Sequence, residues 1–211
     1  MTVELDSAAP RLQELLAEAS LPPLSGEQAV GFQAYLALLL RWNARVNLTA
    51  IRDGEGILSR HFVESIACAR ALPAGIQNLL DFGSGAGFPG IPIALCRPEI
   101  AVTLAESQGK KAAFLSEAVR LLGLPVKVHA ARAEALRAVF DCVTLRAVDK
   151  MEQAVRAAVP MVRAEGWLAL LTTHADLDKL RAAAGVEFSW PCRVALPGGD
   201  ERILALGRRG C

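Results

Sequence analysis

The sequence predicts an α/β protein in which a seven-stranded, mostly parallel sheet follows an N-terminal helical cap. Over residues 1–75 apolar residues recur at helical spacing, and from residue 76 onward short apolar strands alternate with amphipathic helices. Near the start of the second region, the stretch Leu79–Pro92 ends an apolar run in an acid and four glycines. Such a strand-to-helix turn lets a ligand approach the backbone closely. We expect a cap over 1–75 and a core over 76–211, packed as one compact unit.

The composition limits the possible classes of protein. A chain of 211 residues with 53% apolar residues can bury one large core. Its apolar stretches are too short to span a membrane, and the first 20 residues carry four acids rather than a basic and apolar leader. We therefore expect a soluble, cytoplasmic protein without a membrane partner. The net charge of +1 does not indicate a nucleic-acid partner, although a balanced total can hide a basic face.

The cysteines predict reduced thiols and no metal site. Their number is odd, they form no C-x-x-C pair, and no histidine lies at metal-ligand spacing from them. They are Cys68, Cys96, Cys142, Cys192 and Cys211.

Three helices are expected in the cap. The first lies near Pro10–Ser20, before two prolines. Ser25 and Gln28 form a capping-box pattern that begins a second helix, which reaches about Trp42. A polar, turn-like segment leads to the third helix, over about Glu55–Ala71.

Strands and helices then alternate through the core. Strands are expected near Asn78–Phe82, Ala101–Ala105, Val126–His129, Cys142–Leu145, Trp167–Thr172, Val186–Ala195 and Ile203–Leu206. Helices are expected near Gly90–Cys96, Lys110–Leu121, Ala133–Val139, Met151–Val162 and Asp176–Ala184. The segment Leu196–Asp200 has no room for a helix, so the last two strands should form an antiparallel hairpin.

The glycine pattern alone permits a dinucleotide. Gly85, Gly87 and Gly90 satisfy G-x-G-x-x-G, and an acid ends the next predicted strand. Pyrophosphate, however, is held by free N–H groups at a helix N-terminus, and Pro89 and Pro92 remove two of these donors. A ligand without phosphate fits this turn better.

S-adenosylmethionine is such a ligand. Its ammonium group can be met by an acid such as Asp81, and its ribose hydroxyls need an acceptor such as Glu106. Its positive sulfonium is compatible with this acidic edge. A doubly wound sheet that ends in an antiparallel hairpin is also similar to the class I, Rossmann-like fold of S-adenosylmethionine-dependent methyltransferases.

Phe88-Pro89-Gly90-Ile91-Pro92 after the glycines is one block that is specific to a known family, and Trp42-Asn43 with Asn47-Leu48-Thr49 is another. By these blocks the chain resembles the bacterial GidB/RsmG family along residues 42–202. Further matches are Arg52-Asp53, Arg60-His61, Glu64-Ser65-Ile66, Arg97-Pro98, Thr103 through Lys111, Phe114-Leu115, Arg132, Glu134, Phe140-Asp141, Arg146-Ala147 and Gly199-Asp200-Glu201-Arg202. The resemblance implies an enzyme that methylates guanine N7 in 16S rRNA of the small ribosomal subunit, near the decoding region.

The same resemblance implies roles for individual residues. Gly83 and Phe88 would bind the cofactor from the glycine loop, with Ala133 and Glu134 on the adenine side. Arg146 would lie near both cofactor and base. Together with the acids proposed above, the expected cofactor set is Asp81, Gly83, Gly85, Gly87, Phe88, Glu106, Ala133, Glu134 and Arg146.

Methylation of guanine N7 requires positioning rather than a general base, because N7 has an available lone pair. The sequence agrees, since Leu145–Val148 stands where enzymes that methylate exocyclic amines carry Asn/Asp-Pro-Pro-Tyr. Arg146 is the expected positioning residue, donating either to guanine O6 or to the methionine carboxylate. Phe88, expected to be exposed by the glycine turn, is a candidate to stack on a base.

RNA contacts are expected from Arg60, His61, Lys110 and Arg202. His61 has two open alternatives, shaping the pocket mouth or acting as an ordinary helix histidine. Thr172-Thr173 stands where many relatives carry a lysine-glycine pair, which puts a basic contribution from that loop in doubt. The protein is expected to be a monomer.

Two alternatives remain from the sequence. One is a methyltransferase for another RNA position or for a small molecule, which the near-neutral charge favours. The other is a noncatalytic factor that binds S-adenosylmethionine or RNA, which the same glycine loop would allow.

Overall fold

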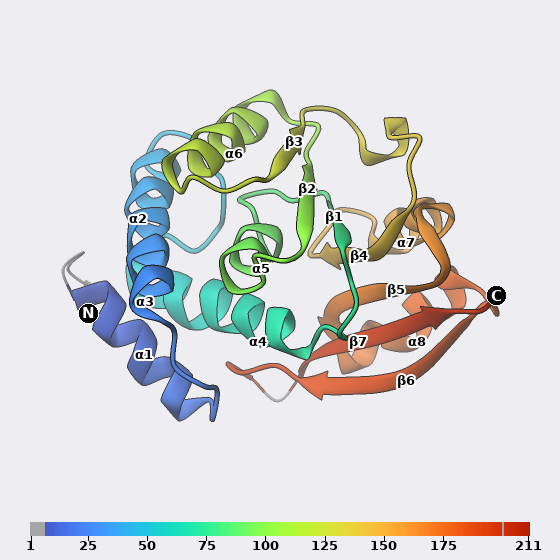
Figure 1. The fold of residues 1–211 in the computed structure, drawn as a ribbon. Coiled ribbons are helices and arrows are strands. Elements are labelled where there is room, and N and C mark those ends of the chain that lie inside the picture. The colour runs from blue at the N-terminus through green and yellow to red at the C-terminus, as the bar shows by residue number, and fades with distance from the viewer. Residues whose placement is uncertain (1–6, 200) are drawn as a thin grey trace.

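A seven-stranded sheet organises the computed structural model, which describes residues 7–199 and 201–211 (Figure 1). The strands are β1 (Asn78–Phe82), β2 (Ala101–Ala105), β3 (Lys127–His129), β4 (Phe140–Arg146), β5 (Val162–Thr173), β6 (Phe188–Ala195) and β7 (Arg202–Arg209). Their order is β3-β2-β1-β4-β5-β7-β6. Asp200 of the predicted hairpin loop lies outside the described residues, as do residues 1–6 of the predicted cap.

The pairing confirms the predicted fold class. The strands β3, β2, β1, β4 and β5 pair in parallel. β7 lies between β5 and β6 and is antiparallel to both, as the short link between the last two strands predicts. The carboxyl ends of the parallel strands therefore meet at one edge, where ligands gather in such sheets.

The helices before β1 are α1 (Ala8–Glu18), α2 (Gly26–Asn43), α3 (Gly54–Gly56), the π-helical segment η2 (Ile57–Phe62) and α4 (Val63–Ala71). The predicted capping box is present, because the Ser25 and Gln28 side chains each bond the other's backbone amide. The predicted third helix was wrong in one respect: it contains a π-helical turn. Such turns often mark functional sites, and this one carries Arg60 and His61.

The remaining helices are α5 (Gly90–Cys96), α6 (Gly109–Leu121), α7 (Met151–Ala158) and α8 (His174–Ala184), with 3-10 turns η3 (Ala133–Ala135) and η4 (Val159–Met161). The expected helix over Ala133–Val139 was wrong, because only η3 forms there. Leu136 is half-buried while its neighbours Arg137 and Val139 are exposed. Without an apolar face to bury, so short a segment gains too little to form a helix.

Two apolar layers cover the sheet. On one face, cap residues such as Leu12, Phe32 and Phe62 form a continuous cluster with α5, α6 and with Leu79 of β1. On the other face, α7 and α8 pack on Leu80 and its neighbours. Figure 1 shows the cap helices, in blue to cyan, on the side of α5 and α6. The cap thus shares its core with the sheet.

Within the described residues, no helix is long and apolar enough to cross a membrane. The same residues contain no cluster of three or more His, Cys, Asp or Glu side chains arranged to hold a metal ion.

Candidate active site

The loop after β1 forms one wall of a pocket at the carboxyl edge of the parallel strands. Gly83 and Gly85 have φ angles of +71° and +57°, a region that residues with side chains rarely adopt. A Cβ atom on Gly83 would lie 3.1 Å from the Val148 side chain. The Ser84 hydroxyl donates to the Asp81 carbonyl at 2.9 Å and fixes the turn. The loop can therefore present its backbone directly to a ligand.

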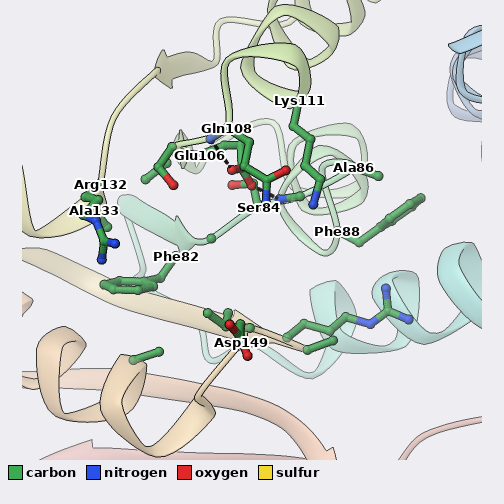
Figure 2. Close-up of a pocket in the computed structure, with 18 of the residues that line it drawn as sticks. Phe82, Ser84, Ala86, Phe88, Glu106, Gln108, Lys111, Arg132, Ala133 and Asp149 are labelled. Carbon is green, nitrogen blue, oxygen red and sulfur yellow. Dashed lines mark hydrogen bonds between the residues drawn. The ribbon is translucent and has the colours of Figure 1, made fainter. Parts of the chain in front are cut away.

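The pocket has a volume of about 930 Å³, toward the upper end of the roughly 300–1,000 Å³ typical of small-molecule sites. Its lining combines the carboxyl ends of β1, β2 and β4 with cap residues 48–50 and His61. Figure 2 shows Phe88 at the opposite end from Arg132 and Ala133, with Glu106 and Asp149 on facing sides. The cavity thus joins the glycine loop to the cap.

The pocket brings together most of the residues expected to bind the cofactor. Gly87 of the loop does not line the cavity, and a Cβ added to it would be 2.8 Å from the Tyr35 hydroxyl oxygen. Asp81 is also absent from the lining. The expected residues that line the cavity are Gly83, Gly85, Phe88, Glu106, Ala133, Glu134 and Arg146.

Glu106 is held in place by the backbone around it. Its Oε2 accepts from the Gly85 amide at 2.9 Å, and its Oε1 accepts from the Gln108 amide at 2.7 Å. A carboxylate has about four lone-pair sites, so each oxygen can still accept a hydroxyl hydrogen. The side chain is therefore both oriented and available to a ligand in the pocket.

Asp81 differs from the expectation that it contacts a ligand's ammonium group. Its carboxylate is buried, where Oδ2 accepts from the Gly90 amide at 3.2 Å and Oδ1 from the Thr144 hydroxyl at 2.9 Å. Burial raises the pKa of Asp81 to about 6, against the opposing effect of these hydrogen bonds. Asp81 therefore acts from beneath the pocket, by joining β1, β4 and the start of α5.

The expectation that Phe88 is exposed was wrong, because only 6% of the residue is accessible. Its ring stacks on His61, with centroids 4.8 Å apart, and lies 5.5 Å from the Tyr35 ring. The Arg146 guanidinium carbon is 5.7 Å from the same ring centroid. Phe88 thus borders the cavity as part of an aromatic cluster.

Glu64 is a residue of the site that the sequence did not indicate. It is fully buried, and its carboxylate is 2.8 Å from Arg146 Nη2, 3.0 Å from Arg202 Nη1 and 3.4 Å from Arg60 Nε. The four-residue spacing of Arg60 and Glu64 is the signal that could have suggested part of this cluster. Glu64 gathers three guanidinium groups beside the pocket.

His61 connects this cluster to the cap loop, the segment of residues 44–53 between α2 and α3. Its Nδ1 is 2.9 Å from Arg146 Nη2, and its Nε2 is 2.7 Å from the Thr49 hydroxyl oxygen. Burial, with the nearby arginines, lowers the pKa of His61 to about 3, so the ring is neutral near pH 7. A neutral ring stacked on Phe88 suits the pocket-mouth alternative better than a contact with phosphate.

The basic residues expected at the RNA surface are separated by the fold. Arg60 and Arg202 pair with Glu64, whereas Lys110 is exposed on α6 and does not line the pocket. Its neighbour Lys111 lines the cavity instead, and Figure 2 shows it extending from α6 toward Ser84. Helical periodicity could not decide between two adjacent lysines at the start of a helix.

The sequence assigned no site role to several other lining residues. Gln108 and Asp149 each follow a strand, but many polar residues do. Thr49 belongs to the cap segment, which is distant in sequence from the glycine loop and reaches the pocket only through tertiary folding.

The residues present fit S-adenosylmethionine. The glycine backbone leaves room for close approach, since nothing but the Gly83 carbonyl, at 4.0 Å, lies within 4 Å of a Cβ added to Gly85. The Glu106 carboxylate retains acceptor capacity for ribose hydroxyls. Ala133 offers an apolar surface at the end of the cavity opposite Phe88 (Figure 2). A nucleoside can therefore span the cavity from Ala133 toward Arg146.

The chain is similar in sequence to proteins of one known family. The family model GidB, described as rRNA small subunit methyltransferase G, matches residues 28–189. A ribosomal RNA small subunit methyltransferase G from Roseiflexus sp. (strain RS-1) is 45% identical over 150 residues, which cover 68% of this chain and 64% of that relative. The protein of the same name from Xylella fastidiosa (strain M23) is 47% identical over 83% of this chain and 85% of its own length.

Among solved structures, the S-adenosylmethionine-dependent methyltransferase SibL in its apo form has a TM-score of 0.61 at 16% identity. The match covers 98% of this chain and 76% of that one. At this identity the likeness supports the fold alone.

Proposed function

Because the chain belongs to the GidB family of small-subunit rRNA methyltransferases, we propose that its pocket holds S-adenosylmethionine beside a guanine of 16S rRNA. The enzyme methylates N7 of that guanine, the activity of this family. The observation that carries the proposal is the meeting of the glycine loop, Glu106 and Arg146 in one cavity.

Bound S-adenosylmethionine supplies an electrophilic methyl group on a sulfonium sulfur. Guanine N7 would form the new N–CH3 bond with its own lone pair while the S–CH3 bond breaks and S-adenosylhomocysteine leaves, so no residue of the chain has to remove a proton first. Rate acceleration then comes from orientation and from electrostatic stabilisation. This agrees with the lowered pKa of His61, the histidine of the pocket lining, because a ring with a pKa of about 3 is a poor base.

Glu106 and Arg146 would orient the two reactants. Glu106 accepts from the ribose hydroxyls of the cofactor with the lone pairs that Gly85 and Gln108 leave free. Within the described residues, every hydrogen bond of Arg146 runs through Nη2, so Nε and Nη1 remain to donate into the pocket. Guanine O6 or the methionine carboxylate is the acceptor that suits them.

The direct test is transfer of tritium from labelled S-adenosylmethionine into small-subunit rRNA that lacks the modification. Aniline cleavage then reports whether the methyl group is on N7, and mapping of the break gives the nucleotide. Gly83→Asp is the control, because its carboxylate would enter the pocket beside Val148 and abolish cofactor binding in calorimetry. Cofactor binding by the wild type without any incorporation would contradict the proposed function and favour a noncatalytic binding factor.

The proposed substrate also indicates where the protein works, and its oligomeric state is a separate point. We place it in the cytoplasm, where bacterial ribosomal subunits are assembled, and infer that it acts as a monomer. Comparing naked 16S rRNA with assembled subunits in the same tritium assay identifies the form that is methylated. Light scattering of the active protein measures its mass, and a dimer would contradict the monomer.

A further inference from the structure

We propose that the Thr49 hydroxyl selects guanine by donating a hydrogen bond to its O6 atom. The series of hydrogen bonds Arg146–His61–Thr49 makes this hydroxyl a donor. The inference rests on the proposed function, since it concerns the base that occupies the same pocket. It assigns a specificity role to the cap loop, which the glycine motif does not include.

Arg146 determines which atoms donate and which accept in this series of hydrogen bonds. A guanidinium group has only donors, so His61 Nδ1, at 2.9 Å from Arg146 Nη2, must be an acceptor. In a neutral imidazole the other nitrogen then carries the hydrogen. His61 Nε2 therefore donates to Thr49 Oγ1 at 2.7 Å.

Thr49 receives a second donor from the backbone. The Ile51 amide lies 3.3 Å from Thr49 Oγ1, so both lone pairs of this oxygen have a donor. The only remaining hydrogen-bonding capacity of the hydroxyl is its own hydrogen. Because Thr49 lines the cavity, a ligand there meets a hydroxyl that donates and does not accept.

Asn43 fixes the position of this hydroxyl. Its buried Oδ1 accepts from the amides of Leu48 and Thr49, at 2.9 and 3.0 Å, and its Nδ2 donates to the Ile51 carbonyl at 3.0 Å. The cap loop is thereby held at both ends around Thr49. A donor held in place before the base arrives costs little entropy to use.

A fixed donor distinguishes the two purines. Beside N7, guanine presents the acceptor O6, whereas adenine presents the donor N6 amino group. The Thr49 hydroxyl can donate to guanine O6. Opposite the adenine N6 amino group, two donors would meet without an acceptor. Burying such an unpaired group is more costly than losing the bond itself. The hydrogen-bond series thus favours guanine through its O6 atom, which lies beside the methylated N7.

The test combines a change in Thr49 with a change in the base. Thr49→Val keeps the shape of the side chain and removes the hydroxyl, whereas Thr49→Ser keeps the hydroxyl. 2-Aminopurine at the target position keeps N7 and removes O6. Each pair of enzyme and RNA is compared by the kcat/KM of tritium transfer, with cofactor affinity measured by calorimetry. Thr103→Val, a threonine of β2 away from the lining, is the matched control.

On guanine, Thr49→Val should lose about 10- to 100-fold in kcat/KM, the range expected for a specific base contact. Thr49→Ser should stay within about threefold of the wild type, and all variants should bind S-adenosylmethionine alike. Replacing guanine by 2-aminopurine should lower the kcat/KM of the wild type at least about tenfold. On 2-aminopurine, the kcat/KM of Thr49→Val should be no lower than that of the wild type.

Three results would overturn the inference. Thr49→Val could equal the wild type on guanine, it could lose the same factor on both bases, or 2-aminopurine could cost the wild type nothing. The last arm needs no variant, so it remains decisive if Thr49→Val fails to fold. Failure of the proposed function itself would be visible separately, as absence of N7 methylation by the wild type.

Discussion

Glu64 concentrates the electrostatics of the site in one buried carboxylate. Arg60, Arg146 and Arg202 all lie within 3.4 Å of its oxygens, and its side chain has no exposed surface. In a buried cluster of this kind, removing one partner leaves the others uncompensated, which costs more than the pair itself contributes.

Glu64→Ala should therefore lower the free energy of unfolding by about 3 kcal/mol, measured by urea denaturation. Glu64→Gln should cost less, since its amide oxygen still accepts a hydrogen bond. Glu14→Ala removes a mostly exposed partner of Arg11 and should change stability by no more than about 0.5 kcal/mol. Equal stabilities of the Glu64 and Glu14 variants would contradict the importance of the cluster.

Asp81 makes a prediction about pH. Its pKa is raised from the ordinary 3.8 to about 6 in the fold, so between these values the folded chain binds more protons than the unfolded one. Stability contributed by this group is present at low pH and is lost as pH rises through that window. Asp81→Asn cannot ionise. The unfolding free energy of the variant minus that of the wild type should thus increase from pH 4 to pH 6, and a flat difference would contradict the raised pKa.

These residues also mark what the sequence could predict about the site. The glycine loop and Glu106 are local signals, because each follows a strand that periodicity identifies. The burial of Phe88 is not local, since it depends on His61 and Tyr35 from the cap. The inward direction of Asp81 depends likewise on the Gly90 amide and on Thr144, which a neighbouring strand supplies.

At the level of elements, helix α2 is bonded directly to the glycine loop. The buried Tyr35 hydroxyl donates to the Ala86 carbonyl, and the same oxygen leaves no room for a side chain at Gly87. The helix of the cap thus holds the loop from behind, on the side opposite the cavity.

Tyr35→Phe should remove this support with little change in packing. The Ala86 carbonyl would be left buried without its partner, at a cost of about 1–3 kcal/mol in unfolding free energy. The looser loop should bind S-adenosylmethionine more weakly in calorimetry. Phe32→Leu on the same helix is the control, because Phe32 lies in the core away from the lining and should affect stability alone. Unchanged cofactor affinity in Tyr35→Phe would show that the hydroxyl does not support the loop.

Elements were predictable where an apolar face defines them. The strands β1 and β2 and the helix α5 have the predicted bounds, because their apolar runs end at glycine, proline or charge. The segment after Ala133 lacks such a face, and the π-helical turn of η2 depends on contacts that no periodicity records. The predictions of elements thus failed where a segment has no apolar face to bury and where packing partners from elsewhere decide the backbone.

For the whole molecule, cap and sheet should unfold together. They share one apolar cluster, and Arg11 of α1 is 2.8 Å from Glu55 of α3 within the cap. Tryptophan fluorescence, which includes Trp42 on α2 and Trp167 on β5, should follow the same urea transition as the loss of helical circular dichroism. Two separate transitions would instead indicate that the cap and the core are independent domains.

The bond between Tyr35 and the glycine loop also affects how long the chain survives in a cell. A ligand that binds only the folded state stabilises it by about 2.7 kcal/mol at 100 times its dissociation constant. Since the loop is tied to the cap, and the cap to the common core, this gain protects the whole chain from proteolysis. Starvation for methionine would thus shorten the life of the protein as well as slow its reaction.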